Sequence, residues 1–510
     1  MTKDKVITKQ DILDDYIKLT RNYYKSTKKA RIPRDVYRAH TTISEDLVRK
    51  HFGGLSGLRI EAEKILNLKT RNNTEIKNNF NSKKYIITSI VEGASINEDF
   101  FQALKLYADK NNSQLILIWT KGVKCIDIFD PESYKRFKPY LITSGKLNDN
   151  LAIGDFSVHP TQMDPLKGLD RFGTKETSLI VGSTKLMMAS IPRPKGQIPH
   201  LLWSTGTLSL PSYSRTRSGV IAQQDNHLSA LVVEIESNKK FYIRPVEWVN
   251  NCFVDLGKAY YKNKVKDIET EAMVLGDLHL GEENQTALKV SLNQIDILKP
   301  KKVFLHDIIS FNSISHHNFG KYLTKSLVPE HINTLEKELE YAKNILSKIS
   351  NKIKANIFIV HSNHDDFLYK YLDNGEFIKD ISNSLLGAEF FIDFRKGINP
   401  VEKYLKLPKL NFLKEDTSYK VNGIECGIHG DKGNNGGKGT PNAFRKSNDK
   451  IILGHSHQPR ILGDTWYVGT LSQLSLPYTK GNSSWLHANA IIYANNGRQL
   501  IIWIDEKWKL

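Results

Sequence analysis

Five short apolar segments in the second half of the chain each end in residue types that bind metal ions. They read MVLGDLHLG, VFLHDIIS, IFIVHSNHDD, ECGIHGD and IILGHSHQ. Apolar runs of this length that alternate with helical stretches predict strands of an α/β sheet. In an open α/β sheet, ligands bind beyond the carboxyl ends of the strands. We therefore expect the polar residues at these five ends to converge, although each motif alone is as often structural.

The converging residues are oxygen and nitrogen donors, with no thiolate among them: Asp277, His279, Asp307, Asn363, His429, His455 and His457. Such donors suit octahedral or five-coordinate Mn, Fe or Zn better than a structural zinc. Seven donors are too many for one ion, whereas two ions that share a carboxylate account for all of them. Two metals about 3.5–4 Å apart can hold a phosphate and polarise a water, which is the chemistry of phosphoester hydrolysis. The predicted cofactors are two divalent ions, with Mn first and Fe, Zn or Mg as alternatives.

The order DLH, HD, NHD, IHG and GHSH resembles that of calcineurin-like metallophosphoesterases over roughly residues 272 to 510. The resemblance implies a two-sheet sandwich flanked by helices, with two metal positions. One ion would be bound by Asp277, His279 and His457. The other would be bound by Asn363, His429 and His455. Asp307 would bridge the two ions.

The resemblance also implies a catalytic acid. His364, beside Asn363, would meet the phosphate and protonate the leaving oxygen. Asp365 would orient His364, although a carboxylate that stabilises a helix N-terminus explains Asp365 equally well. His316 and His317 could reach the phosphate or the leaving group, and the alternative is a pair of surface histidines.

Three positions depart from the common family pattern. His306 and Ser362 stand where the family usually has Gly before the bridging Asp and before the Asn. After Asp307 the chain reads Ile-Ile-Ser, so it lacks the second Asp and the phosphate-clamping Arg of the phosphoprotein phosphatases. Nuclease members of the family can do without that clamp. The resemblance therefore favours the nuclease branch, which includes phage DNA-degrading enzymes.

Residues 1–80 are predicted to form a helical DNA-binding segment. Thr42 to Glu45 has the capping-box pattern, and Gly53 and Gly54 end the short helix that follows. A short helix, a tight turn and a second basic helix resemble a helix-turn-helix. The basic residues available to phosphates are Arg49, Lys50 and Arg59. A helical bundle whose basic residues are merely solvated is the alternative.

The net charge favours a polyanionic partner. It is +18, and residues 1–84 hold 20 Lys and Arg against 10 Asp and Glu. We expect DNA rather than an anionic membrane as the partner, and a role in solubility alone is the alternative. The glycine-rich loop after His429 carries further basic residues that could follow a DNA backbone, with a solvated loop as the alternative: Lys432, Lys438 and Arg445.

The remaining composition places the protein inside a cell. The chain has no apolar run long enough to span a membrane, and its N-terminus is polar where a secretion signal would be apolar. Three widely separated cysteines without a CxxC spacing indicate a reducing compartment. We expect the cytoplasm, or the host cytoplasm if the protein is viral.

Residues 85–250 look like a degenerate copy of the second half. LIVGSTKLM matches ILGHSHQPR and WSTGTLSLPSY matches YVGTLSQLSLPY, with Ser183 and Lys185 at the positions of His455 and His457. Ile90 falls near the place of Asp277. Chance similarity between α/β segments is the alternative. A copy without metal ligands would be free to bind DNA, to pack on its partner domain or to build a homo-oligomer.

The resulting hypothesis is an α/β protein with three parts: a helical segment at 1–80, a degenerate metallophosphoesterase-like domain at 85–250 and a catalytic domain at 270–510. Its predicted activity is metal-dependent hydrolysis of DNA phosphodiester bonds. One alternative is a phosphomonoesterase or a small-molecule phosphodiesterase. Another is a DNA-binding scaffold without catalytic activity.

Overall fold

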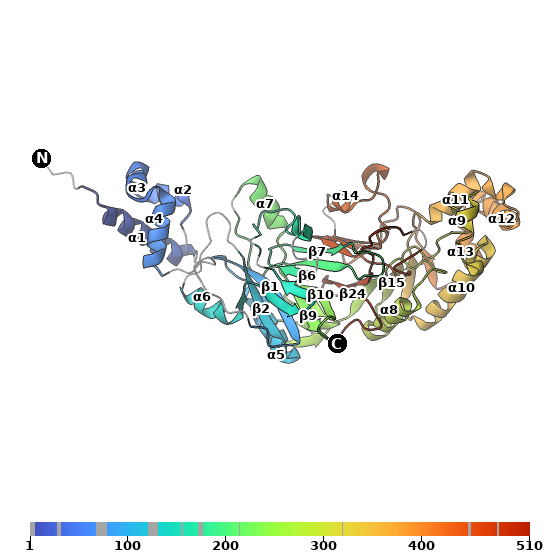
Figure 1. The fold of residues 1–510 in the computed structure, drawn as a ribbon, viewed down its shortest axis with the longest axis horizontal. Helices are drawn as coiled ribbons and strands as arrows, with labels where there is room; N and C mark the ends of the chain where they lie inside the picture. The colour runs from blue at the N-terminus through green and yellow to red at the C-terminus, as the bar shows by residue number, and fades with distance from the viewer. Residues whose placement is uncertain are drawn as a thin grey trace.

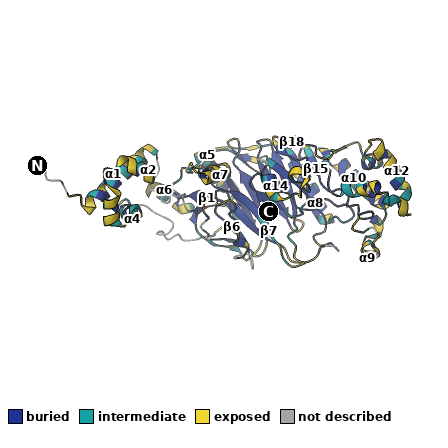
Figure 2. Cartoon of the chain, turned by 90° about the horizontal axis from the view of Figure 1, so that it is seen from above, coloured by how far each residue is buried: buried dark blue, intermediate teal, exposed yellow. Residues whose placement is uncertain are grey.

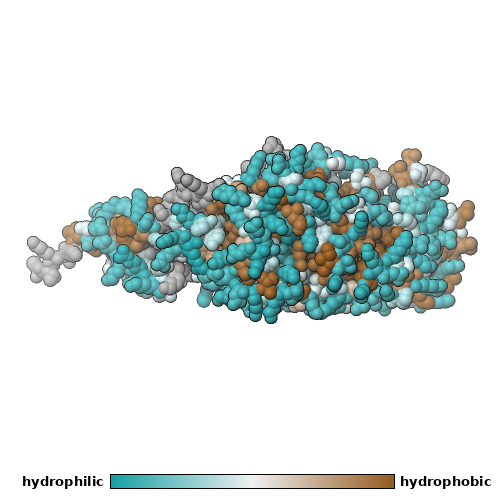
Figure 3. Space-filling model, turned by 90° about the horizontal axis from the view of Figure 1, so that it is seen from below, coloured by the Kyte–Doolittle hydropathy of each residue, from teal (hydrophilic) through white to brown (hydrophobic). Residues whose placement is uncertain are grey.

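The computed structural model describes residues 6–510 apart from 28–31, 68–78, 121–130, 155, 157, 172–176, 214, 319, 447–449 and 477–478. It shows a mixed α/β protein with several sheets and a helical segment at the N-terminus (Figure 1). The strands in the middle are largely buried, and the helices at both ends carry many exposed residues (Figure 2). From below, the surface is mostly hydrophilic, with hydrophobic side chains gathered in patches (Figure 3). No described helix is long and apolar enough to cross a membrane.

Four helices form the N-terminal segment: α1 (Lys9–Thr27), α2 (Arg34–His40), α3 (Glu45–Phe52) and α4 (Leu55–Ile65). Their apolar faces enclose a small core that contains Tyr16, Tyr37 and Leu58. This segment lies at one end of the molecule (Figure 1).

The start of α3 differs from the predicted capping box at Thr42. The N-cap is Ser44, whose side chain accepts a hydrogen bond from the Leu47 amide. Glu45 forms an ion pair with Arg38. A capping box needs the acidic side chain to bond back to the N-cap amide, so the competing arginine explains the difference.

The first α/β part contains a five-stranded sheet with the order β10-β9-β1-β2-β3. Its strands are β1 (Lys84–Val91), β2 (Gln114–Thr120), β3 (Leu141–Ile142), β9 (Ser229–Ile235) and β10 (Phe241–Glu247). The first three are parallel, and β9 runs antiparallel to both β1 and β10. Helix α5 (Glu98–Asn111) connects β1 to β2 and buries Phe100 and Leu104 against the sheet.

The second α/β part has a six-stranded sheet with the order β17-β16-β15-β14-β23-β24. Its strands are β14 (Thr270–Val274), β15 (Lys302–Leu305), β16 (Asn356–Ile359), β17 (Leu410–Phe412), β23 (His487–Tyr493) and β24 (Arg498–Trp503). Strands β14 to β17 are parallel, and β23 runs antiparallel to β14. Helix α8 (Gln285–Leu298) connects β14 to β15 as α5 connects β1 to β2. The two sheets therefore share one strand order.

A ten-stranded sheet joins the two parts, with the order β18-β19-β20-β22-β21-β7-β8-β6-β5-β4. From the first part come β4 (Gly145–Asn148), β5 (Leu151–Ile153), β6 (Ser178–Val181), β7 (Leu186–Ile191) and β8 (His200–Thr205). From the second come β18 (Lys420–Val421), β19 (Ile424–Glu425), β20 (Lys450–Leu453), β21 (Arg460–Leu462) and β22 (Thr465–Tyr467). The halves meet where β7 and β21 pair antiparallel. Read outward from this pair, both halves have the same order, as a duplicated unit would.

The ten-stranded sheet packs face to face on the two smaller sheets. The core between them includes Ile87 and Val274 from the smaller sheets and Trp203 and Trp466 from the large one. Helix α5 covers the outer face of the five-stranded sheet, and α8 and α10 (Leu335–Lys352) cover that of the six-stranded sheet. The site residues follow strands of both layers.

The segment between β15 and β17 carries further helices at the end opposite the N-terminal segment (Figure 1). They are α9 (Tyr322–Lys325), α11 (Asp365–Asp373), α12 (Ser384–Arg395) and α13 (Pro400–Leu405). The shorter elements elsewhere are α6 (Pro131–Phe137), α7 (Arg217–Gln224), α14 (Pro441–Arg445), β11 (Phe253–Asp255), β12 (Lys258–Tyr260) and β13 (Val265–Asp267).

Candidate metal centre

All seven predicted donors lie just beyond strand ends, and both sheet layers contribute them. The six-stranded sheet supplies Asp277 and His279 after β14, Asp307 after β15 and Asn363 after β16. The ten-stranded sheet supplies His429 after β19 and His455 and His457 after β20. Parallel neighbouring strands end at one edge of a sheet, so residues distant in the sequence meet there.

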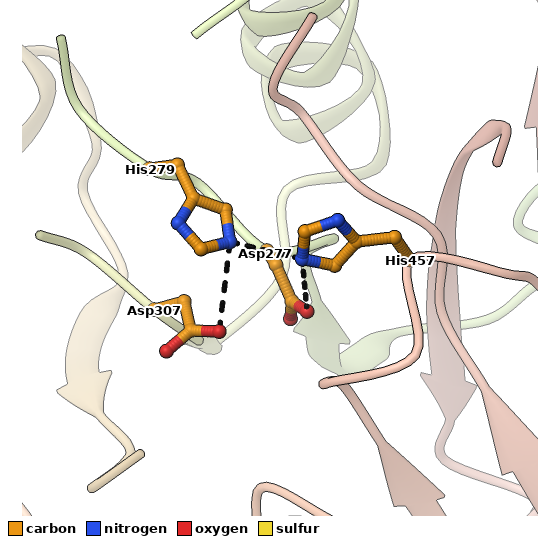
Figure 4. Close-up of side chains that lie close together, drawn as sticks. All are labelled: Asp277, His279, Asp307 and His457. Carbon is orange, nitrogen blue, oxygen red and sulfur yellow. Dashed lines mark hydrogen bonds and ion pairs between the residues drawn. The ribbon is translucent and has the colours of Figure 1, made fainter. Parts of the chain in front are cut away.

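The first group contains Asp277, His279, Asp307 and His457 (Figure 4). The Nε2 atoms of His279 and His457 lie 2.9 Å apart. His457 Nε2 is 3.3 Å from Asp277 Oδ2, and His279 Nε2 is 3.6 Å from Asp307 Oδ2. One ligand atom from each of the four buried residues lies within 4.8 Å of the others, so the group could hold a metal ion.

The second group shares Asp307 with the first. His429 Nε2 lies 3.2 Å from Asp307 Oδ2 and 3.2 Å from Asn363 Oδ1. His455 Nδ1 lies 3.0 Å from the same Asn363 oxygen. One carboxylate oxygen therefore stands between two sets of nitrogen and oxygen donors.

Several polar atoms of the first group are buried without a hydrogen-bond partner among the described residues. They are both carboxylate oxygens of Asp277, Oδ1 of Asp307 and Nδ1 of His457. Asp277 is 0% exposed and Asp307 is 2% exposed. Burying a carboxylate without compensation costs several kcal/mol, so native proteins pair such groups or use them to bind metals. The donor chemistry and the missing partners together fit divalent cations.

The backbone around the site adopts conformations that non-glycine residues rarely take. The φ angles are 46° at His279, 43° at Asp307, 68° at His455 and 54° at His457. Each such residue costs on the order of 1 kcal/mol, and such strain clusters at functional sites. Gly454 is required for a different reason, because a Cβ there would lie 2.3 Å from Oδ1 of Asp277.

The electrostatics of the site keep its carboxylates ionised. Burial opposes the charge on Asp307, but the imidazoles of His429 and His364 outweigh burial and hold the pKa of Asp307 well below its usual value. Burial likewise opposes the charge on Asp277, but the nearby imidazoles of His457 and His429 outweigh burial and lower the pKa of Asp277. Burial lowers the pKa of His279 to about 3. For His429, Asp307 outweighs burial and raises the pKa to about 9.

Ser310 orients His279. Its hydroxyl donates to Glu282 Oε2 at 3.2 Å and lies 2.9 Å from His279 Nδ1, so it accepts the Nδ1 hydrogen. This leaves the lone pair of His279 Nε2 for the centre of the site. A second partner that fixes the tautomer of a histidine in this way is typical of metal ligands.

The candidate acid His364 is held by main chain. Its Nδ1 donates to the Ser310 carbonyl at 2.8 Å, which leaves Nε2 for another partner. Asp365, predicted to orient His364, instead accepts hydrogen bonds from the amide and hydroxyl of Ser362 at 2.9 and 3.1 Å. The Ser310 carbonyl is therefore the contact that holds the His364 ring, and Asp365 lies in the first turn of α11.

A cleft with a volume of about 490 Å³ opens over the site. Asp307, Asn363, His364, His455 and His457 line it, together with Asn312, Ser315, His317, Asn318, Thr324, Phe367 and Trp485. His317 thus lies at the cleft. The His316 ring lies against the His317 ring, with the ring centroids 3.9 Å apart and the ring planes at 40°.

The basic residues that were predicted to contact DNA have different surroundings. Arg49 and Lys50 are exposed on α3, and Lys438 is exposed in the glycine-rich loop. Arg59 is partly buried and donates to the Ile32 carbonyl at 3.0 Å, so it ties α4 to the segment before α2. Lys432 pairs with Asp366 at 3.1 Å and with Glu415, so two carboxylates compete with a phosphate for it.

The first α/β part carries other residues at the equivalent positions. Ser89 pairs with Thr207 as Asp277 pairs with Thr470, so Ser89, one residue before Ile90, takes the place of Asp277. Lys185 takes the place of His457. Its side chain is 1% exposed, and its ammonium lies 2.8 Å from Asp225, which also binds Arg445 at 2.8 Å. The first part therefore has a positively charged lysine at the position where the second part has His457, a candidate metal ligand.

Sequence reasoning missed several residues around the site. His306 was noted as a departure from the family pattern, yet its ring is fully buried, with Nδ1 at 3.3 Å from His429 Nδ1, and it forms a further metal-like group with Asp277 and His429. Ser310 contacts His279 and His364, and Trp485 lines the cleft. Both depend on contacts with distant segments, so no local motif signals them.

No protein-family model matches the chain. Protein A1 of Escherichia phage T5 is 29% identical to it over 459 residues, which cover 82% of this chain and 81% of that protein. The chain is therefore a distant homologue of this phage protein, with a buried cluster of His and Asp side chains that could bind metal.

Proposed function

We propose that the protein is a metal-dependent DNA nuclease that hydrolyses phosphodiester bonds with two divalent ions. The observation that carries this proposal is the position of Asp307. Its Oδ2 atom lies 3.6 Å from Nε2 of His279 in one donor group and 3.2 Å from Nε2 of His429 in the other. A shared carboxylate between two donor sets is the arrangement that two-metal hydrolases use.

The seven predicted donors would be shared between the two ions as the resemblance to calcineurin-like metallophosphoesterases implies. One ion would take Asp277, His279 and His457. The other would take Asn363, His429 and His455. The ions, Mn before Fe, Zn or Mg, would act as Lewis acids on the phosphate and on the attacking water.

The protein's own groups would complete the reaction. His364 lines the cleft, and its Nδ1 is already bonded to the Ser310 carbonyl, so a proton for the leaving oxygen would come from Nε2. Asn312, Ser315 and Asn318 line the cleft and offer neutral hydrogen bonds to the substrate.

Three features favour DNA over a small phosphoester. The net charge is +18, and Arg49 and Lys50 are exposed on α3, the first helix of the helix-turn-helix-like pair α3 and α4. None of the described cleft-lining residues is Lys or Arg, the side chains that usually clamp a terminal phosphate. We propose residues 1–80 as a DNA-binding segment and residues 85–250 as a degenerate copy of the metallophosphoesterase domain at 270–510.

Digestion of supercoiled plasmid and of end-labelled linear DNA, with Mn or with EDTA, tests the proposal. The wild type should cleave with Mn and stop with EDTA. Asp307→Asn and His364→Ala should each lower the rate at least about 100-fold. The matched control is Asp267→Asn, since that side chain is 83% exposed on β13.

The two rival functions give different results in the same assays. Turnover of a chromogenic phosphomonoester without DNA cleavage would identify a small-substrate phosphatase. A gel shift with DNA but no cleavage under Mn would identify a DNA-binding scaffold.

A further inference from the structure

Five rings form a continuous row through the candidate metal centre. Trp485 lies 4.2 Å from His457, measured between ring centroids, and His457 lies 4.8 Å from His279. His279 lies 4.9 Å from His364, which in turn lies 4.7 Å from Phe367. The three inner rings are histidines of the proposed active site. An aromatic side chain that binds no metal therefore stands at each end of the row.

Both terminal rings line the cleft and keep part of their surface in solvent. Trp485 lies two residues before β23, and Phe367 lies in the first turn of α11. Four other tryptophans, Trp119, Trp203, Trp466 and Trp503, are 0–1% exposed in the cores. An aromatic ring that is exposed to water in a polar cleft does not contribute its free energy of burial to folding, whereas a bound ligand that covers the ring would gain it.

The rest of the cleft offers neutral polar groups. Asn312, Ser315, Asn318 and Thr324 line it with amides and hydroxyls, and no described lining residue is Lys or Arg. A phosphate dianion would thus find little compensating charge beyond the metal centre. A substrate that combines a phosphodiester with flat apolar rings matches both the polar floor and the aromatic ends.

We infer that the strand at the metal centre is unpaired nucleic acid, whose bases stack on Trp485 and Phe367 beside the phosphate that is cleaved. The inference rests on the proposed nuclease function and defines its substrate. In a duplex each base is stacked on its neighbours, so these rings can reach bases only in a single strand, a gap or a frayed end. Base–aromatic stacking is nearly independent of sequence, because every base presents a π face.

The first test measures binding without catalysis. A fluorescein-labelled hexamer of thymidine is titrated with the full-length protein in EDTA, beside a hexamer in which tetrahydrofuran sugars replace all bases. Both ligands carry the same phosphates, so the ratio of their Kd values reports base contacts alone. We expect the thymidine hexamer to bind about 5- to 150-fold more tightly for each base that stacks.

Variants show whether Trp485 produces this ratio. Trp485→Leu should lower the ratio, and Trp485→Phe should largely retain it because the replacement is still a flat ring. The control is Phe391→Leu, which removes a 37% exposed aromatic ring from α12, outside the cleft. If Trp485 only supported His457, Trp485→Leu would change both Kd values by one factor and leave the ratio as in the wild type.

The second test adds Mn and compares single-stranded circles with relaxed duplex circles, which have no ends to fray. We expect the single-stranded circles to be cut at least about 10-fold faster. Equal rates on the two circles, or equal binding of the two hexamers, would overturn the inference. Absence of cleavage on every DNA would instead refute the nuclease function, and the hexamer ratio would still decide whether bases stack.

Discussion

Glu338 links the stability of the protein to pH through the loop beside the cleft. This residue of α10 is 0% exposed. Its carboxylate accepts hydrogen bonds from the Asn312 amide at 3.0 Å and from the amide and hydroxyl of Ser313 at 3.2 and 2.7 Å. Burial outweighs these bonds and raises the pKa of Glu338 from 4.5 to about 7.

The size and sign of the effect follow from this shift. Above pH 7, Glu338 is ionised in both the folded and the unfolded chain, and the cost of burying its charge is fully present. As pH falls from 7 towards 4.5, the folded protein binds a proton that the unfolded chain does not, so the protein becomes more stable. With about 1.4 kcal/mol per pKa unit, the gain between pH 8 and pH 5 is roughly 2–3 kcal/mol.

Urea unfolding at pH 5 and pH 8, with EDTA present, measures this gain. Other ionisable groups contribute to the same pH dependence, so the informative quantity is the difference between the wild type and Glu338→Gln. The glutamine keeps the acceptor oxygen and removes the charge. On acidification the wild type should gain roughly 2–3 kcal/mol more stability than the variant. If the free energy of unfolding of the wild type rises no more than that of Glu338→Gln, the pKa of Glu338 is not raised in the folded protein.

Three further predictions concern residues around the sites. Asp225→Ala should cost about 2–3 kcal/mol because it strands the buried ammonium of Lys185, whereas Lys185→Met should change stability by less than about 1 kcal/mol; equal losses in urea unfolding would contradict the pairing. Ser310→Ala should weaken Mn binding about 10- to 100-fold, as measured by calorimetry, because its hydroxyl orients His279. An unchanged affinity for Mn would show that the hydroxyl does not orient His279. Gly454→Ala should abolish Mn binding, since its Cβ would meet Asp277 at 2.3 Å; wild-type affinity would show that the site can relax.

The placement of the metal-binding types of residue could be predicted from local patterns. Each donor follows an apolar run, and a run of this kind is a strand wherever it lies in the chain. Asp277 after β14 and His455 after β20 are examples. The similar strand patterns of the two α/β parts could be read in the same way, because strands and turns leave periodic traces. The one-residue shift from Ile90 to Ser89 reflects how poorly sequence patterns define strand register.

The partners of polar side chains could not be predicted, because they belong to distant segments. Arg59 was expected to face phosphates and instead donates to Ile32, and Lys432 pairs with Glu415 and Asp366. A long lysine or arginine side chain binds whichever acceptor the fold brings within its reach.

The sequence alone determined which donor atoms this protein has and that they stand at strand ends, because residue type and apolar periodicity are local properties. The tertiary structure decided that Asp307 lies between two groups of histidines. It also decided that Trp485 and Phe367 line the same cleft. Distances between side chains hundreds of residues apart depend on how the ten-stranded sheet packs on the smaller sheets. That packing is a collective result of the whole core, and no single motif encodes it.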